Sequence, residues 1–498
     1  MNKTYILGID QSTTGTKAVV LDQLGQFIGK VSKEHKQYYP KPGWVEHNLE
    51  EIYNNTIYLA KEVIAKTSID INKLAGISIT NQRETIALWD LETGKPLYNG
   101  LVWQCRRGVS ICETLANQGY EKIIEEKTGL KLDTYFSASK IKWAIDNVPE
   151  VKDAIKRSTL CIGTIDSWLV FKLTDGKEHV TDYTNASRTM LFNIHELDWD
   201  DELLSIFGVK RWMLPKIKSS NDYFGEVKPK KITESAITIS GVIGDSQGAL
   251  FGQQCFVEGM AKATYGTGSS IMMYVGDEKV LSDNGLVTSI AWCIDGQVKY
   301  ALEGMINSSG DTLKWVKDNL GLYSSHEELD TYVHSISSNE GVYIVPAFVG
   351  LGAPYWKQNA KAAIIGLSRK SNKAHIIRAA IESMAYQVDD LIYLIEKDSG
   401  KKIKGLNVDG GPSKDSFLMQ LQSDLLDVNI YCSKYQELSI LGALYLGGLG
   451  FGIWKDIEDI KKLRKTARIY TPIQDRENIN LCKKQWNEAI QKVLYEVK

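Results

Sequence analysis

The chain carries almost no net charge, which excludes several classes of partner. Its 498 residues include 59 Lys and Arg against 61 Asp and Glu, a formal charge of -2 at pH 7. This balance creates no strong field to attract nucleic acid or an anionic membrane surface. Long apolar runs are also missing, and the N-terminal stretch MNKTYILGID contains no signal-type apolar region. We therefore expect no nucleic-acid partner, no export and no membrane insertion.

Cysteine is sparse, and its spacing excludes the common metal and disulfide frameworks. Seven cysteines are scattered along the chain without a CxxC pair, and their number is odd. We therefore predict reduced thiols in a cytoplasmic protein. Hydrophobic residues make up 43% of a chain of this length, which is enough for two or three packed domains.

Two common nucleotide-binding fingerprints are absent from the N-terminal segment. Residues 4–34 alternate short apolar runs with a Gly/Ser/Thr turn and a second turn at Gly25. This pattern predicts a β-meander rather than a strand that leads into a helix. Neither GxxxxGK[ST] nor GxGxxG occurs there. Any phosphate site in this segment must therefore be of another kind.

The sequence does contain a repeated hairpin pattern. From residue 258 the order returns: an apolar strand, a GTGSS turn at 266–270, a second strand and a turn at Gly276. Two copies about half a chain apart suggest two similarly built domains. Segments that follow alternate strands with helices, so we predict α/β domains over residues 1–250 and 251–498.

The hairpin tips have the composition of phosphate sites. Backbone N–H groups and hydroxyls of Thr13, Thr14 and Gly15 can surround phosphate oxygens, and Lys17 adds a positive charge. Asp10, at the end of the preceding strand, could hold Mg²⁺ directly or through water. A single tip of this kind is usually an ordinary polar turn. The second copy favours a site, because two tips across a cleft could bind both ends of a polyphosphate.

A third glycine-rich element, LNVDGGPSKDSFLMQ, begins at residue 406. Gly411 could let the backbone pass close to a flat or phosphorylated ligand, while Lys414 or Asp415 reaches the ligand's polar edge. An ordinary turn between a strand and a helix explains the same pattern. By itself, this element does not distinguish a ligand site from an ordinary turn.

A single carboxylate, Asp245, stands in the glycine-rich run ISGVIGDSQGALFGQ. At a turn near the domain junction it could accept a proton from a hydroxyl during group transfer. The same aspartate could instead be the N-cap of a helix that begins with SQGALFG. The two roles can coexist.

Four residues of the first half could contact a polyhydroxylated ligand. Arg83 beside Glu84 offers donors next to an acceptor, a pairing suited to vicinal hydroxyls. Trp103 could lie along a carbon chain, and Tyr135 could offer its hydroxyl. Each also has a simpler explanation, namely a surface ion pair for the two charged residues and packing for the two rings.

Taken together, the strings resemble the FGGY family of carbohydrate kinases. The matching strings run in order from about residue 4 to about residue 455: GIDQSTTGTK, NQRET, GLVWQCRR, GTIDSWL, HVTDYTNASRTMLFN, ISGVIGDSQGALFG, ATYGTG, YALEG, VPAFVGLGAPYW and VDGG. The resemblance implies an α/β fold with two actin-like ATPase (ribonuclease H-like) domains flanking an interdomain catalytic cleft. It also implies transfer of the γ-phosphoryl group of ATP, with Mg²⁺, to a hydroxyl of a small polyol, with glycerol as the first expectation.

Carried over residue by residue, the resemblance makes Asp245 the base, and Asp10 keeps the role of a Mg²⁺ ligand that its place beside the first hairpin tip suggests. It places seven residues against the acceptor: Arg83, Glu84, Trp103, Tyr135, Asp245, Ser246 and Ser270. It places nine residues against ATP: Thr13, Thr14, Gly15, Lys17, Thr267, Gly310, Lys314, Gly411 and Asp415.

Several of these positions depart from the pattern of the resembling family. Ser246 and Ser270 stand where members that act on glycerol typically carry a glutamine and an aromatic residue. Lys17 replaces an arginine that many relatives have, and Lys314 and Asp415 replace neutral amides. The two serines would enlarge the acceptor pocket and make it more polar.

Two alternatives follow from these departures and from the nucleotide motifs. A longer polyol or ketose, such as erythritol, threitol, xylulose or ribulose, could be the acceptor. The nucleotide motifs alone also permit an actin-like ATPase switch that is not a kinase. The resemblance further leads us to expect a homo-oligomer, either a dimer or a tetramer.

Overall fold

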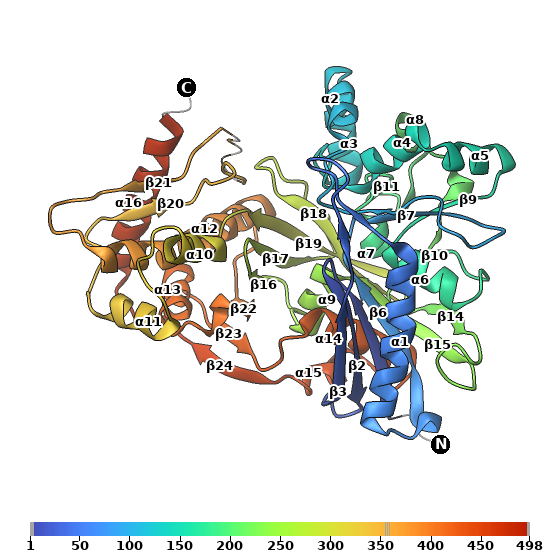
Figure 1. The fold of residues 1–498 in the computed structure, drawn as a ribbon. Coiled ribbons are helices and arrows are strands. Elements are labelled where there is room, and N and C mark those ends of the chain that lie inside the picture. The colour runs from blue at the N-terminus through green and yellow to red at the C-terminus, as the bar shows by residue number, and fades with distance from the viewer. Residues whose placement is uncertain (1–3, 354, 356, 358, 496–498) are drawn as a thin grey trace.

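The computed structural model describes residues 4–353, 355, 357 and 359–495, which form two α/β halves (Figure 1). The sheet of the first half has six strands in the order β14-β15-β6-β1-β2-β3. Strands β1 to β3 form an antiparallel meander, as predicted, and β6 and β15 extend the sheet in parallel. The bounds in chain order are β1 Tyr5–Gln11, β2 Gly15–Asp22, β3 Phe27–Glu34, β6 Leu74–Asn81, β14 Tyr223–Val227 and β15 Ile237–Gly244.

The sheet of the second half has seven strands in the order β18-β19-β17-β16-β22-β23-β24. Strands β16 and β17 form the predicted second hairpin, and β22 pairs with β16 in parallel. The bounds are β16 Met260–Tyr265, β17 Ser269–Gly276, β18 Val287–Ile294, β19 Gln297–Ile306, β22 Gly405–Gly410, β23 Ile430–Ser433 and β24 Thr466–Tyr470. In each half, the hairpin thus supplies the first two strands of the sheet in chain order.

Smaller sheets flank these two. Five short strands in the order β4-β5-β8-β7-β9 enlarge the first half: Gln37–Tyr38, Glu46–His47, Gly100–Leu101, Ile86–Asp90 and Leu160–Thr164. Three two-stranded sheets pair β10 Val180–Asp182 with β13 Lys216–Lys218, β11 Phe192–Asn193 with β12 Asp198–Trp199, and β20 Tyr343–Val345 with β21 Ala363–Ile365.

Helices cover both sheets. Those up to residue 252 are α1 Leu49–Thr67, α2 Val109–Asn117, α3 Glu121–Thr128, α4 Ser137–Asn147, α5 Pro149–Arg157, α6 Ile165–Leu173, α7 Tyr183–Ala186, α8 Asp201–Phe207 and α9 Asp245–Gly252. The later ones are α10 Gly310–Asp318, α11 His326–His334, α12 Lys373–Ser399, α13 Ser416–Leu426, α14 Leu438–Gly450, α15 Ile457–Lys461 and α16 Arg476–Tyr495. Short 3₁₀ turns occur at Ile71–Lys73, Arg211–Met213 and Pro412–Lys414.

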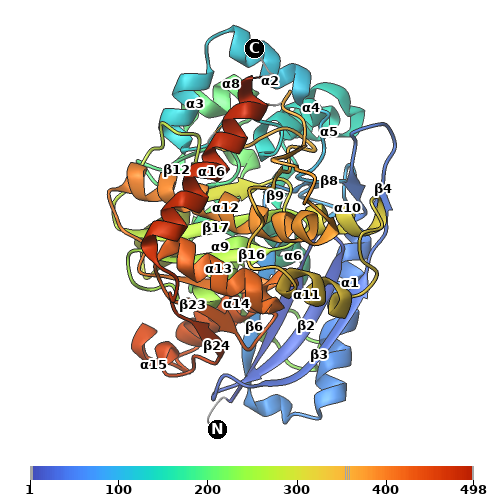
Figure 2. The same ribbon diagram turned by 90° about the vertical axis from the view of Figure 1, so that its left-hand side faces the viewer.

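Successive side chains of a strand point to opposite faces of its sheet, and this alternation explains why helices pack on both faces. In the first sheet Leu7 and Ile9 belong to the core beneath α1, whereas Ile6 faces the other way, toward α14. In the second sheet Ile271 belongs to the core shared with α12, whereas Met272 faces α9. Helices α9 and α14 therefore lie between the two sheets and share one core with both (Figures 1 and 2).

The contact between α9 and α14 is made by glycine. A Cβ on Gly442 would overlap the carbonyl oxygen of Gly248, and one on Gly252 would overlap the carbonyl oxygen of Leu438. The helix LSILGALYLGGLG is apolar on all sides, as expected for a helix that is buried all round. The two backbones can therefore approach closely, which fixes the distance between the sheets.

The C-terminal stretch differs in one respect from what its sequence indicates. Its pattern predicts helix and loop, and α15 and α16 confirm the helical part. The segment TARIY, however, pairs with β23 as the edge strand β24. Its residues are largely exposed, so it has too little apolar alternation to predict a strand from sequence.

Two further findings concern the whole described chain. None of its helices combines the length and apolar character needed to cross a membrane. All seven cysteines are present as free thiols, five of them buried.

Replacement of Gly442 by alanine should destabilise the protein. The added methyl group meets backbone rather than a flexible side chain, so the two helices must separate, at a cost of about 1 to 3 kcal/mol. Thermal unfolding measures the effect. Gly411→Ala is the matched control, because Gly411 has a φ of -57° and an added Cβ there meets no atom within 4 Å. An unchanged melting temperature for Gly442→Ala would contradict the packing described here.

Candidate active site

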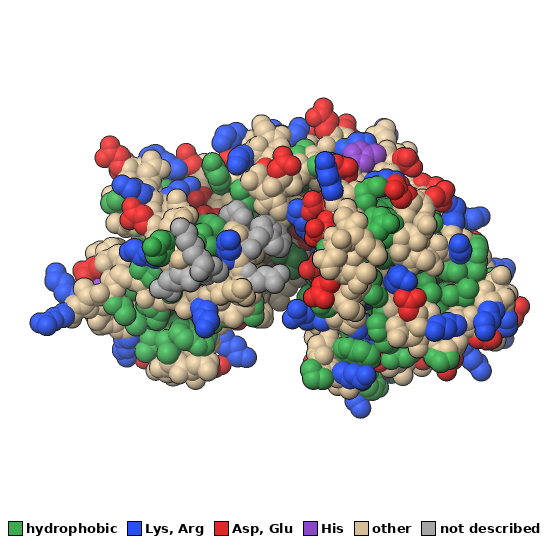
Figure 3. All heavy atoms as spheres, turned by 90° about the horizontal axis from the view of Figure 1, so that it is seen from above, with side chains coloured by type: hydrophobic (Ala, Val, Ile, Leu, Met, Phe, Trp, Pro, Cys, Tyr) green, Lys and Arg blue, Asp and Glu red, His purple; other side chains and the backbone are tan. Residues whose placement is uncertain are grey.

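Two neighbouring parallel strands bring the principal side chains of the site together. Strand β6 ends at Asn81, just before Arg83 and Glu84, and β15 ends at Gly244, opposite Asn81 in the pairing. Parallel neighbours present their carboxyl ends at the same edge of a sheet. As a result Arg83 Nε lies 3.2 Å from Asp245 Oδ1. Figure 3 shows the molecule hollowed between its two halves.

Asp245 does not cap its helix in the way the sequence suggests. The N-cap of α9 is Gly244, and Asp245 is the first helical residue. Its Oδ1 accepts a hydrogen bond of 2.7 Å from the backbone N–H of Ser246. The side chain keeps 37% of its surface exposed. The carboxylate is therefore held by the helix start while an incoming ligand can still reach it.

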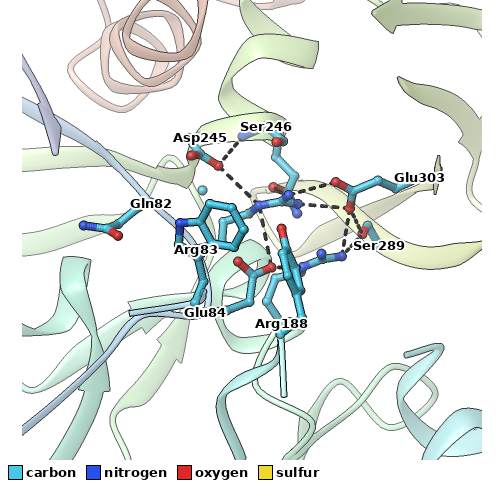
Figure 4. Close-up of polar contacts among 12 residues, drawn as sticks. Gln82, Arg83, Glu84, Arg188, Asp245, Ser246, Ser289 and Glu303 are labelled. Carbon is cyan, nitrogen blue, oxygen red and sulfur yellow. Dashed lines mark hydrogen bonds and ion pairs between the residues drawn. The ribbon is translucent and has the colours of Figure 1, made fainter. Parts of the chain in front are cut away.

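Arg83 belongs to a buried cluster of alternating charges drawn from both halves (Figure 4). Its two terminal nitrogens donate to the two carboxylate oxygens of Glu303 on β19, at 3.1 and 2.8 Å. Arg188 lies 2.8 Å from Glu303 and donates from Nε to Glu84 at 2.6 Å. Ser289 on β18 accepts a further hydrogen bond from Arg188 at 2.8 Å. A simple surface ion pair between Arg83 and Glu84 is thereby excluded.

The protonation of the cluster follows from burial and charge. Burial raises the pKa of Glu303, but the guanidinium groups of Arg188 and Arg83 outweigh it and hold that pKa well below its ordinary value. Burial raises the pKa of Glu84, because its two arginine neighbours compensate only partly. Glu303 thus remains a carboxylate and fixes the direction in which both arginines point.

Glu84 is held in an unusual backbone conformation. Its φ is +60°, a region that residues with a side chain rarely adopt, and the hydroxyl of Ser137 donates to its carbonyl at 3.0 Å. Arg188 binds its Oε1. Among the described residues no hydrogen bond reaches Oε2, which leaves that oxygen as an acceptor for a ligand hydroxyl.

The predicted aromatic residues lie beside this cluster. Trp103 and Tyr135 contact each other edge to face, with ring centroids 5.3 Å apart, and both are half-buried. Burial raises the pKa of the Tyr135 hydroxyl, and the charge of Glu84 raises it further. Trp103 Nε1 donates to Thr13 Oγ1 at 2.9 Å. A predicted acceptor residue and a predicted phosphate residue are therefore in contact.

A buried polar network supports the strand ends that carry these residues. The N–H of Gly244 donates to Thr184 Oγ1 at 2.9 Å, and the hydroxyl of Thr184 donates to Asp182. Asn185 bonds to Asp182 and exchanges two hydrogen bonds with Asn81. The backbone just before Asp245 and the backbone just before Arg83 are thus tied to one short segment of α7.

The first hairpin places Asp10 and Lys17 opposite each other on β1 and β2. Burial raises the pKa of Asp10 to about 6, against the lowering effect of Lys17 at 3.7 Å. Lys17 itself binds Glu437 at 2.8 Å. Asp10 has this single ion-pair partner among the described residues, and no group of three metal-ligating side chains forms there. Such a carboxylate suits Mg²⁺ that takes its other ligands from water and phosphate.

The remaining residues of this hairpin lie at its tip. Thr13 is half-buried, Thr14 is exposed, and Gly15 begins β2.

The second hairpin gathers three of the predicted nucleotide residues. The backbone of Thr267 accepts N–H bonds from Ser309 and Asp311, on either side of Gly310. A Cβ on Gly310 would come within 2.5 Å of the carbonyl oxygen of Gly266, so only glycine fits this contact. Gly411 follows β22, directly beside β16. The tip, the start of α10 and the turn after β22 therefore form one backbone surface.

The remaining predicted ligand-binding residues make few contacts with the clusters described above. Lys314 is exposed on α10. Asp415 caps α13 by accepting a hydrogen bond of 2.8 Å from the N–H of Leu418, which is the simpler role for this residue. Ser246 is half-buried as the second residue of α9. Ser270, on β17, accepts a hydrogen bond of 3.1 Å from Lys262.

Sequence reasoning missed four charged residues that shape the site: Arg188, Lys262, Glu303 and Glu437. Two of them stand as isolated charges in otherwise apolar strands, in MAKATY and in YALEGMI. A charge inside an apolar strand must find a partner, so this pattern could have indicated them.

Replacement of Glu303 by glutamine should destabilise the fold. It leaves two buried guanidinium groups without their shared counter-charge, which costs about 3 to 5 kcal/mol. Chemical denaturation measures the loss. Ser289→Ala is the control, because it removes a neutral hydroxyl that contacts Arg188 and Glu303 but leaves every charge of the cluster in place, and it should cost about 1 kcal/mol. Equal stabilities for the two variants would show that the charge on Glu303 is not needed.

Comparison with known proteins places this geometry in a family. Residues 5–252 match the model described as "FGGY family of carbohydrate kinases, N-terminal domain", and residues 261–451 match its C-terminal counterpart. Glycerol kinase of Listeria monocytogenes serotype 4a (strain HCC23) is 46% identical over 98% of this chain and 99% of its own. Glycerol kinase of Carboxydothermus hydrogenoformans is 47% identical over 98% of each chain.

Solved structures of carbohydrate kinases have the same fold as this chain. Plasmodium falciparum glycerol kinase with ADP superimposes with a TM-score of 0.94 at 38% identity, over 99% of both chains. A xylulose kinase from Lactobacillus acidophilus, at 24% identity, shares the fold with a TM-score of 0.87 over 98% of this chain and 97% of its own. The predicted α/β fold with two actin-like ATPase domains is confirmed. The chain belongs to the FGGY family of carbohydrate kinases, which are phosphotransferases with an alcohol group as acceptor.

Proposed function

We propose that this protein transfers the γ-phosphoryl group of ATP to a hydroxyl of glycerol, forming glycerol 3-phosphate. The observation that carries the proposal is the meeting of Arg83, Glu84 and Asp245 at one sheet edge, beside Trp103 and Tyr135. This set combines donors, acceptors and apolar ring surface, as a small triol requires. The similarity to glycerol kinases over the whole chain supports the same acceptor.

Asp245 acts as the base in this proposal. Its exposed carboxylate accepts the hydroxyl proton as the acceptor oxygen bonds to phosphorus. Arg83 holds that carboxylate in its direction through the contact at 3.2 Å, and Glu84 accepts a hydrogen bond from a second hydroxyl through Oε2. Phosphoryl transfer needs positioning and charge neutralisation rather than a covalent intermediate with the protein. Exclusion of water by closure of the two halves protects the transfer from hydrolysis.

The nucleotide is bound by the second hairpin and the elements next to it. Among the described residues, the N–H groups of Thr267 and Gly411 donate to no other backbone group, so they can donate to phosphate oxygens. The N–H of Gly310 is bonded to the carbonyl of Gly266, so this glycine contributes close packing of the backbone rather than a donor. Thr13, Thr14 and Gly15 approach from the other half. Asp10 would hold Mg²⁺, and the ion would supply charge that neutralises the phosphates. Lys314 and Asp415 contact the adenosine end. Release of Lys17 from Glu437 lets its ammonium group reach the phosphates.

Three broader properties belong to the same proposal. Residues 1–250 and 251–498 form the two bodies that close, although α14 of the second packs on the sheet of the first. The protein works in the cytoplasm, which agrees with seven free thiols in the described chain. It forms a homo-oligomer, either a dimer or a tetramer, a property that light scattering of the purified protein can test.

The Asp245→Asn variant should lose most phosphoryl transfer while it still binds ATP. Loss of a positioned base lowers kcat by about 10²- to 10⁴-fold, and the KM for ATP should stay close to that of the wild type. Steady-state kinetics with Mg-ATP and glycerol measure both constants. Asp222→Asn, on an exposed turn before β14, controls for the substitution itself. Wild-type turnover by Asp245→Asn would remove Asp245 as the base.

An acceptor panel tests the substrate. ADP release is measured with glycerol, dihydroxyacetone, erythritol, threitol, xylulose and ribulose, and glycerol should give the highest kcat/KM. A four- or five-carbon acceptor that exceeds glycerol by about tenfold would show that Ser246 and Ser270 mark a changed specificity. The reaction without acceptor serves as the control. Fast ADP release there would indicate an ATPase switch, because a kinase that closes on its acceptor hydrolyses ATP only slowly.

A further inference from the structure

Lys262 is a buried lysine to which neither the predicted site nor the mechanism above assigns a role. It lies in the middle of β16, with 1% of its surface exposed. Its ammonium group lies 3.1 Å from Ser270 Oγ and 3.3 Å from Thr264 Oγ1. Among the described residues no carboxylate comes within 4.0 Å of it in an ion pair. An ammonium group buried among neutral partners is costly, so it needs a reason to be there.

The pairing of the strands shows which way Lys262 faces. It pairs with Met272 on β17, and Met272 pairs in turn with Glu303 on β19. Side chains of directly paired residues lie on the same face of a sheet. Lys262 is therefore on the face that bears Glu303 and looks toward α9, the helix that begins with Asp245.

A row of polar residues continues on this face. Thr264 pairs with Ser270 on one side and with Asp409 on the other. Asp409 accepts hydrogen bonds from Thr264 and from Gln253, the residue that directly follows α9. The row thus runs from Glu303, next to Arg83, to Asp409, next to the glycine turn that contains Gly411. Lys262 stands within it, between the predicted acceptor residues and the predicted nucleotide residues.

The charges around Lys262 agree with this placement. Burial lowers its pKa, the carboxylates of Asp409 and Glu303 act against that effect, and Arg83 and Asp245 are near enough to contribute as well. The amine of Lys262, hydrogen-bonded to Thr264 and Ser270, lies in the region between the base and the nucleotide site. An ammonium group has three N–H donors. Two hydroxyls engage two of them, so one donor stays available.

We propose that Lys262 is a catalytic residue that binds the phosphoryl group while it passes from ATP to the acceptor. The ligand class is a phosphoryl anion, and the inference rests on the kinase function proposed above. The acceptor oxygen forms a bond to phosphorus, the bond between phosphorus and the ADP oxygen breaks, and the hydroxyl proton passes to Asp245. Lys262 keeps its proton throughout and donates N–H to a non-bridging phosphoryl oxygen, where negative charge must be stabilised.

The same geometry assigns a role to Ser270. Because its oxygen accepts from Lys262, its own hydroxyl hydrogen is free to donate. Ser270 therefore positions Lys262 and offers one donor toward the acceptor. Loss of the Ser270 hydroxyl should therefore alter the position of the Lys262 ammonium group and also remove the donor toward the acceptor.

Lys140 provides a matched comparison for stability. It is also fully buried, but its ammonium group donates to three backbone carbonyls, those of Thr134, Tyr135 and Phe136, at 2.7 to 2.9 Å. All its donors are used, so its role is structural. Lys140→Met should lower the melting temperature, because three carbonyls lose their donor. Lys262→Met should leave the melting temperature equal to or above that of the wild type.

Kinetics test the catalytic role directly. In Lys262→Met, kcat should fall by about 100-fold or more, with the KM values for ATP and acceptor within about threefold of wild type, as for an interaction made in the transition state. Lys262→Arg should recover part of the rate because it restores the charge. A kcat for Lys262→Met within about fivefold of wild type would overturn the proposal. So would a fall in melting temperature equal to that of Lys140→Met.

A binding measurement complements the kinetics and does not depend on turnover. Mg-ADP with aluminium fluoride and glycerol mimics the phosphoryl group in transfer, and it should raise the melting temperature of the wild type beyond Mg-ADP with glycerol. Lys262→Met should show the Mg-ADP shift but lack the additional one. An additional shift of wild-type size in Lys262→Met would overturn the proposal.

The acceptor assignment and the role of Lys262 fail on different results. If the wild type phosphorylates another acceptor of the panel better than glycerol, the glycerol assignment fails, and Lys262 is tested with that acceptor. If the wild type phosphorylates glycerol and Lys262→Met does so at the same rate, only the role of Lys262 fails.

Discussion

The paired hydrogen bonds between Arg83 and Glu303 are the interaction on which the site depends most. Arg83 follows a strand of the first sheet and Glu303 lies on a strand of the second, so this ion pair joins the two halves at the base of the cleft. Because Arg83 also contacts Asp245, the direction of the Asp245 carboxylate, the proposed base, depends on Glu303 of the opposite half. A guanidinium group fits this task, since its planar fork can bind two carboxylates in fixed directions at once.

The surrounding architecture serves to keep these groups in place. Parallel pairing of β6 with β15 puts Arg83 and Asp245 at the same edge, and the hydrogen bonds of Thr184, Asn185 and Asp182 hold both strand ends. Arg188 orients Glu84 through a hydrogen bond from its Nε to Glu84 Oε1. Arg83 and Glu84 are thus restrained by Glu303 and Arg188, which are assigned no ligand contact, and such support keeps a site's geometry before a ligand arrives.

The sequence predicted the two hairpins, the α/β class and most of the residues that gather at the cleft, because glycine-rich turns and apolar strands leave local signals. It did not predict the charge cluster. Arg188 and Glu303 lie 115 positions apart, and pairing over such a separation leaves no periodicity to detect. The alternative role of Asp245 as an N-cap is wrong by one position, because the N-cap is Gly244 and the helix begins at Asp245 itself; sequence patterns locate helix ends only to within a residue or two. The exposed edge strand β24 lacks the alternation that identifies a strand.

The position of α14 also bears on how the chain is made. Strands β1, β6 and β15 are complete by residue 244, but the helix that covers one of their faces spans residues 438–450. During synthesis, the face of the first sheet that packs on α14 therefore stays uncovered until almost the entire polypeptide has been made. Domains that fold as they leave the ribosome gain early protection from aggregation. The face of the first sheet that packs on α14 lacks that early protection, because the helix that covers it is among the last segments to be made.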